Sequence, residues 1–155
     1  MDDARAAGPD GPERERGAGP RLQVVFDAAD PHSLARFWAQ AVRGEVEDHS
    51  GVVARLLEAG ALPREAVLEV DGRPAFRDVA AVRAEGLPRL FFQRVPEPKT
   101  AKNRCHVDLQ VDPGEAERER ERLLGLGAAH LWTTSDRGPV THTLQDPEGN
   151  EFCLD

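Results

Sequence analysis

The sequence predicts an α+β fold built from two copies of one strand–helix–strands unit, and three observations support this prediction. A strand pattern opens each half, as "RLQVVFD" in the first and "NRCHVDLQV" in the second. Each strand runs into an Asp-Pro pair, at 30–31 and 112–113. Asp at an N-cap followed by Pro is a favourable helix start. A polar stretch with two prolines, "PEPKTAKN" at 96–103, lies between the halves and is typical of a linker.

The same patterns predict the domain boundaries. Residues 1–20 contain no large apolar side chain, so they cannot bury enough surface to offset the entropy lost on ordering. We therefore expect a disordered tail at 1–20 and one folded domain at 21–155. Within it, module one spans 21–95, the linker 96–103 and module two 104–155.

In the first half, apolar residues at helical spacing after Pro31 predict one amphipathic helix that ends near Gly44. The stripe consists of Leu34, Phe37, Trp38, Ala41 and Val42. Farther along, 51–60 is expected to form a short helix, "AVLEV" before "DG" a strand and turn, and 88–95 a strand.

The second half is expected to continue as a helix from 112 to 127 and then three strands. Asp112 and Pro113 should start the helix as Asp30 and Pro31 do. Its run of alternating charges is interpreted as a solvated helix face with weak i,i+3 pairs, whereas Ala116, Leu123 and Leu124 form the buried side. The strands are "AAHLWTTS", "GPVTHTLQ" and "EFCLD", and the turn "DPEGN" separates the last two.

Aligning Gln23 with His106 assigns a face to each opening strand. Strand side chains alternate between faces, so one set should pack beneath the helices and the other should face away. The packed set is Val24, Phe26, Val107 and Leu109. The opposite set is Gln23, Val25, Asp27, His106, Asp108 and Gln110.

Composition excludes several classes of function. The chain has 155 residues and a formal net charge of −8, without a basic stripe, so we expect neither nucleic acid nor an anionic membrane as a partner. No apolar run approaches the ~20 residues of a membrane span, and no signal pattern opens the chain. Two cysteines, Cys105 and Cys153, give no disulfide framework, which favours the cytoplasm.

Three stretches resemble the vicinal oxygen chelate superfamily, and most closely its glyoxalase-like domains: "VVFDAADPHSLARFWAQAV", "PRLFFQRVPEPKTAKNRCHVDLQV" and "LQDPEGNEFCLD". The resemblance implies two βαβββ modules whose curled mixed sheets enclose one shared cavity, with the helices outside. It also implies four strands in each module, so 76–83 is taken as a strand.

Metal-dependent members of this superfamily place a ligand on the first strand of each module and a Glu on the last. Carried over, these positions are Gln23, His106 and Cys153, with Gln93 as the counterpart of Cys153 within one residue. Neutral Gln is a weak donor for a divalent ion, so the sequence argues against a standard metal site. Any metal would use Gln23, His106 and Cys153. No other cofactor is indicated.

Within the implied cavity, His106 is the best candidate acid or base, with Asp108 as a nearby carboxylate. The candidate ligand-binding residues are Gln23, Asp27, Gln93, Gln110, Trp132, His142, Glu151 and Cys153. Each has a structural alternative. His106 can be an interior hydrogen-bonded histidine, Asp27 and Asp108 can pair with arginine, and Cys153 can be a small buried apolar group.

The function we predict is the binding of a small molecule in a polar cavity without a standard catalytic metal. The alternative is an enzyme of the lyase or isomerase type that uses His106 with a carboxylate, with or without metal. A protein-interaction domain remains a third interpretation. Either a monomer or a homodimer can complete the cavity.

Overall fold

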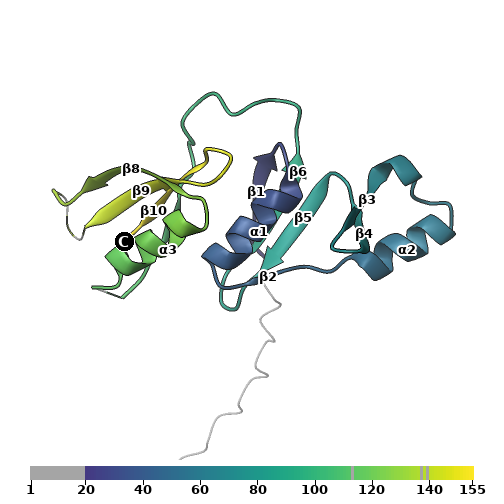
Figure 1. Ribbon diagram of the computed structural model, residues 1–155, viewed down its shortest axis with the longest axis horizontal. Helices are drawn as coiled ribbons and strands as arrows, with labels where there is room; N and C mark the ends of the chain where they lie inside the picture. Colours follow the sequence, from purple (N-terminus) through teal and green to yellow (C-terminus); the bar gives the residue numbers. More distant parts are fainter. Residues whose placement is uncertain (1–19, 113, 137, 139) are drawn as a thin grey trace, which may run out of the picture.

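The structure, a computed structural model, describes residues 20–112, 114–136, 138 and 140–155 and confirms the α+β class (Figure 1). All but the last residue of the expected tail lie outside the described residues. The first half contains β1 (Gln23–Ala28), α1 (Pro31–Ala41), β2 (Glu45–Val46), α2 (Ser50–Glu58), the 3-10 helix η1 (Arg64–Ala66), β3 (Val67–Val70), β4 (Arg73–Phe76), β5 (Val79–Arg83) and β6 (Arg89–Arg94). The second contains β7 (Val107–Leu109), α3 (Ala116–Gly125), β8 (Ala129–Thr134), β9 (Thr141–Gln145) and β10 (Glu151–Leu154).

The strand pairing confirms the duplicated βαβββ unit. One sheet has the order β1-β6-β5-β2 and the other has the equivalent order β7-β10-β9-β8. In both, the first strand runs parallel to the last, and the remaining pairs are antiparallel. Within the described residues no strand of one sheet pairs with a strand of the other, so the sheet is not closed.

Module one differs from module two by an insertion between β2 and β5. Residues 47–78 form α2, η1 and the separate two-stranded hairpin β3-β4, whereas only residues 135–140 connect β8 to β9. The short helix, the "DG" turn and the strand at 88–95 are therefore confirmed, and the strand expected at 76–83 is β5. No helix in the described part of the chain is long and apolar enough to span a membrane.

Helix α1 begins as the sequence predicts and ends earlier. The Asp30 carboxylate accepts the backbone N–H groups of His32 and Ser33, both at 3.1 Å. The helix ends at Ala41, and Arg43 rather than Gly44 takes the left-handed conformation, at φ 52°. Gly44 is required for another reason, because a Cβ there would lie 2.4 Å from the Arg83 carbonyl oxygen.

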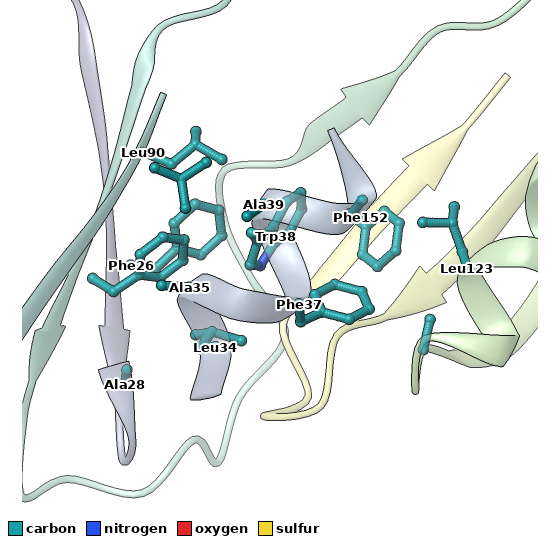
Figure 2. Close-up of a cluster of buried hydrophobic side chains, with 14 of the residues drawn as sticks. Phe26, Ala28, Leu34, Ala35, Phe37, Trp38, Ala39, Leu90, Leu123 and Phe152 are labelled. Atoms are coloured by element: carbon teal, nitrogen blue, oxygen red, sulfur yellow. The ribbon is translucent and has the colours of Figure 1, made fainter. Parts of the chain in front are cut away.

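Trp38 on α1 lies at the centre of a core that both modules share (Figure 2). Its ring is fully buried, 5.1 Å from the ring of Phe26 on β1 and 5.2 Å from that of Phe152 on β10. Its Nε1 donates to Asp146 of module two at 3.1 Å. One helix of module one thus covers apolar side chains from both sheets.

Helix α3 corrects the expectation for module two. It begins at Ala116, its N-cap is Glu115, and no side chain caps it. At the start of α3, Asp112 contributes its backbone oxygen, which accepts the N–H of Glu115 at 3.0 Å. Gly114, at φ 94°, interrupts a helical start at 112, and the predicted role of Pro113 lies outside the described residues.

The charge run on α3 forms its three i,i+3 pairs, but one pair is not on a solvated face. Glu119 is buried and accepts from both Arg43 and Arg122. Arg122 also donates to the backbone oxygens of Gln40 and Ala41, at 2.9 and 2.8 Å. These carbonyls belong to the last turn of α1, and that of Gln40 also accepts the N–H of Arg43, so α3 contributes to the cap of α1 across the two modules.

Candidate functional site

The opening strands place their side chains on the predicted faces. In β1, Phe26 and Ala28 are buried and Val24 is half-buried, whereas Gln23, Val25 and Asp27 are exposed. In module two, Val107 and Leu109 pack against the core, and His106, Asp108 and Gln110 are exposed. Strand β7 is shorter than expected, so His106 and Gln110 lie just outside it.

On the polar face of module one, Arg89 organises a network that sequence reasoning missed. Its Nη1 donates to Gln23 Oε1 at 2.6 Å, and its Nη2 donates to Glu47 at 2.7 Å. Hydrogen bonds from Arg89, with support from Arg83, lower the pKa of Glu47 to about 2. Glu47 follows β2 in the insertion, where no periodic pattern could have placed it beside β6. Gln23 is therefore held by a cation on its own sheet.

The strand register corrects one equivalence between the modules. Val25 of β1 pairs with Phe91, and its counterpart Asp108 pairs with Cys153. Cys153 thus corresponds to Phe91, two residues before the expected Gln93. Gln93 instead donates to Asp27 at 2.9 Å, which places these two predicted residues in direct contact.

On the polar face of module two, four residues form a row across the sheet. Trp132 pairs with Thr143, Thr143 with Cys153, and Cys153 with Asp108. Trp132 keeps 45% of its surface exposed. Burial raises the pKa of the Cys153 thiol, which lies 3.9 Å from Thr143 Oγ1. The thiol is therefore a poor thiolate donor.

His142 does not lie on this face, contrary to its predicted place in a cavity wall. It pairs with Leu154 on β10 and shares the face of Leu144, and both leucines belong to the core. The reason is parity: His142 is one residue away from Thr143, so its side chain points to the opposite side of the sheet. His142 is 6% exposed and hydrogen-bonds to Thr133.

Glu151 is buried and holds the segment that connects the modules. It accepts the backbone N–H of Asn103 at 2.9 Å and lies 3.0 Å from the Lys99 ammonium. Burial alone would raise the pKa of Glu151, but these two donors lower it to about 2. Its carboxylate is occupied by these partners.

The other predicted residues of module two lie apart. His106 Nε2 is 2.5 Å from the ammonium of Lys102 on the connecting segment. Gln110 lines a hollow of about 450 Å³ beside Arg43 and Glu119, on the side of the helix junction. The structure therefore does not bring the predicted residues of the two modules into one cavity.

A larger hollow, of about 590 Å³, lies where the two modules meet, and we name it the seam hollow. Its walls are β1, the connecting segment and the "DPEGN" turn. Of the predicted site residues, only Asp27 borders it. The lining residues that matter for its chemistry are Val25, Asp27, Val95, Glu97, Lys99, Asn103, Arg104, Cys105, Val107, Glu148 and Asn150. A connecting segment without periodicity forms much of this wall, which is why sequence patterns did not reveal it.

The "DPEGN" turn fixes one end of the seam hollow. Asp146, 3% exposed, accepts the backbone N–H groups of Glu148 and Asn150 at 3.0 and 2.9 Å. The Glu148 carboxylate accepts the N–H groups of Ala29 and Asp30 at 2.7 and 2.8 Å. The turn of module two is thus bonded to the β1–α1 junction of module one.

The residues at the expected metal positions do not fit a divalent cation. Gln23 is hydrogen-bonded to a guanidinium, His106 faces an ammonium, and the thiol of Cys153 has a raised pKa. The position equivalent to Cys153 in module one is the apolar Phe91. Among the described residues, no cluster of three or more His, Cys, Asp or Glu side chains could hold a metal ion.

Several solved structures share this architecture. The fosfomycin resistance protein FosX from Mesorhizobium loti has a TM-score of 0.59 and 13% identity, covering 88% of this chain and 90% of that chain. A FosX mutant from Listeria monocytogenes, complexed with Mn(II) and 1S,2S-dihydroxypropylphosphonic acid, gives 0.60 and 13%, covering 88% and 91%. A glyoxalase/bleomycin resistance protein/dioxygenase family enzyme from Burkholderia phytofirmans PsJN gives 0.58 and 14%, covering 85% and 94%.

At these identities the similarity concerns the fold alone. No curated protein matches the chain. The model of the glyoxalase-like domain family matches residues 23–154, which include both modules and the connecting segment. The chain therefore belongs to the glyoxalase-like domain family of the vicinal oxygen chelate superfamily.

Proposed function

We propose that this glyoxalase-like domain binds a small organic anion in the seam hollow, without a metal at the family's usual positions. The observation that supports the proposal most is the hollow itself. Its volume of about 590 Å³ lies within the range of small-molecule sites, and its walls combine valine side chains with a few polar groups. It is also bounded by both modules, as binding sites between structural units often are.

Arg104 determines the charge of the proposed ligand. It lines the hollow, is exposed, and makes no hydrogen bond or ion pair with another described residue. The nearby Lys99 is already held by Glu151, and Asp27 and Glu148 already accept hydrogen bonds. A carboxylate or phosphonate would therefore meet a free guanidinium, which binds such groups through two parallel hydrogen bonds.

The apolar part of the ligand has a matching surface. Val25 keeps 48% of its surface exposed on β1, and Val95 and Val107 line the same hollow. Among the described strands β1 pairs only with β6, and residues of β1 line the hollow, so the other edge of β1 is available to a ligand there. Such an edge supplies hydrogen bonds that orient a ligand.

Binding accounts for these residues better than catalysis does. Among the described residues no histidine lines the hollow, and of its three carboxylates Asp27 and Glu148 are engaged while Glu97 is exposed. His106, the expected acid or base, faces Lys102 rather than a carboxylate. No observation in the described part of the chain therefore favours the lyase or isomerase alternative.

The test is a thermal-shift and calorimetric screen of small carboxylates and phosphonates with metal-free full-length protein. We expect one class to bind at one molecule per chain and Arg104→Ala to weaken it about tenfold or more, since a hydrogen bond to a charged group contributes about 1.5–3 kcal/mol. Arg118→Ala is the matched control, because Arg118 is an exposed arginine on α3 away from the hollow. Equal affinity in Arg104→Ala would place the ligand elsewhere and refute the proposal.

A further inference from the structure

Two histidines converge on one hydroxyl group on the helix-facing side of module two. His130 Nε2 lies 2.9 Å from Thr133 Oγ1, and His142 Nδ1 lies 2.9 Å from the same oxygen. The rings come from adjacent strands, β8 and β9, with centroids 6.2 Å apart. A β-bulge between His130 and Trp132 brings His130 to the same side as Thr133.

The second ring nitrogen of His142 faces a carboxylate. Its Nε2 lies 3.7 Å from Glu117 Oε2 on α3, and Glu117 is also paired with Arg120. The carboxylate favours the tautomer of His142 with its proton on Nε2, which leaves a lone pair on Nδ1 toward Thr133. Desolvation by burial lowers the pKa of His142.

We propose that His130 and His142 bind one divalent transition-metal ion of the zinc, nickel or copper type, at the point where their nitrogens meet beside Thr133. Neutral imidazole suits these ions. A ligating histidine whose other N–H faces a carboxylate is the usual arrangement around them, because the carboxylate orients the ring and raises its basicity. Here Glu117 takes that role for His142. The Thr133 hydroxyl and water complete the coordination.

This site differs from the one that the family resemblance implied. Trp132, Thr143 and Cys153 lie on the opposite face of the same sheet, and His106 precedes β7. With two imidazoles as its only strong donors, the site should exchange its ion readily and keep open positions. Because the ligands lie on neighbouring strands, the bound ion would also join β8 to β9.

The first experiment is calorimetric titration of ZnCl₂ into untagged, chelator-treated, full-length protein. We expect one zinc ion per chain with the wild type and with His106→Ala, and no saturable binding with His130→Ala. His130 is exposed, so its replacement should leave the fold intact. Glu117→Gln should bind about tenfold more weakly, which is the low end of the loss seen when a carboxylate behind a ligating histidine is removed.

Tryptophan fluorescence tests where the metal ion binds. Trp132 is adjacent to the site along β8, whereas the other tryptophan, Trp38, is fully buried in the shared core. Saturating Ni²⁺ should therefore quench the fluorescence of Trp132, and should do so in Trp38→Phe but not in His130→Ala. Undiminished zinc affinity in His130→Ala, loss of binding in His106→Ala, or no binding by the wild type would each overturn the proposal.

Discussion

The two modules share a strand framework and differ in their helices. Both sheets have the same order and the same parallel pairing of first and last strands. Yet α1 is capped by Asp30 and buries most of its apolar side chains, whereas α3 has no side-chain cap and buries Leu123 and the charged Glu119. The strands therefore define the fold, whereas α1 supplies much of the core that joins the modules.

The polar faces show a second contrast. The register places Arg89 of module one at the position equivalent to Glu151 of module two, so opposite charges occupy matching sites. Each binds a nearby segment: Arg89 binds Glu47 of the insertion, and Glu151 binds Lys99 of the connecting segment. Charged groups on these faces therefore stabilise the fold. Strand alternation alone would predict that they are available to a ligand, but these two are already paired.

The greatest predicted loss of stability concerns α1 and the core that it shares with both sheets. Trp38→Ala should lower the free energy of unfolding by about 3–5 kcal/mol, because it opens a cavity between the modules. It also removes a donor to the buried carboxylate of Asp146. Urea denaturation followed by circular dichroism measures the loss. If the variant does not fold, Trp38→Phe keeps an aromatic ring without the donor and should show a smaller loss.

Trp132→Ala is the matched control on module two, because this ring is 45% exposed on the face opposite the core. Its replacement should change the free energy of unfolding by less than about 1 kcal/mol. Equal losses for the two variants, or a Trp38→Ala protein in which one module unfolds at an unchanged urea concentration, would show that α1 does not join the modules.

The second prediction concerns Glu151, the counterpart of Arg89, and the pH dependence of stability that its carboxylate causes. The pKa of Glu151 in the folded chain is about 2, below its usual 4.5. A lowered folded-state pKa stabilises the fold above the unfolded value, and this stabilisation disappears as the pH falls from about 4.5 toward 2. At about 1.4 kcal/mol per pH unit, the contribution reaches at most about 3.5 kcal/mol.

Glu151→Gln should lose that contribution at neutral pH and show a flatter stability profile at acid pH. Measuring the free energy of unfolding from pH 7 down to the lowest pH at which the wild type stays folded tests this. Glu69→Gln, an exposed carboxylate on β3, should leave the profile unchanged. A wild-type and a Glu151→Gln profile that run parallel would mean that the Lys99 and Asn103 contacts contribute nothing to stability.

Local patterns predicted the strands and their faces because those features follow from alternation and from Asp-Pro pairs. Val24 and Phe26 pack in the core for this reason, and the equivalent side chains of β7, Val107 and Leu109, pack against the same core. The same alternation explains why His142 was assigned to the wrong face. When only the approximate ends of a strand are predicted, a shift of one residue moves each side chain to the opposite face. Periodic patterns identify strands and helices, but they do not show how many turn residues precede the next element.

The candidate site depended on contacts between distant segments, and sequence patterns say little about these. Glu47 reaches Arg89 from an insertion, and Glu148 reaches Ala29 and Asp30 from the other module. Each such pair forms only through tertiary packing, so the sequence around either residue does not predict its partner. Sequence patterns did not predict the seam hollow for the same reason, because the irregular connecting segment forms much of its wall.

The smallest effect compares the two Asp-Pro pairs, which look alike in sequence. Asp30→Ala should lower the free energy of unfolding by about 1 kcal/mol, the usual loss for an N-cap, because two N–H groups of α1 lose their acceptor. Asp112→Ala should have little effect, since only the backbone oxygen of Asp112 takes part and alanine retains it. Thermal unfolding of both variants, measured side by side, gives the comparison. Equal losses would mean that the Asp112 side chain caps α3 after all and that the two helices begin in the same way.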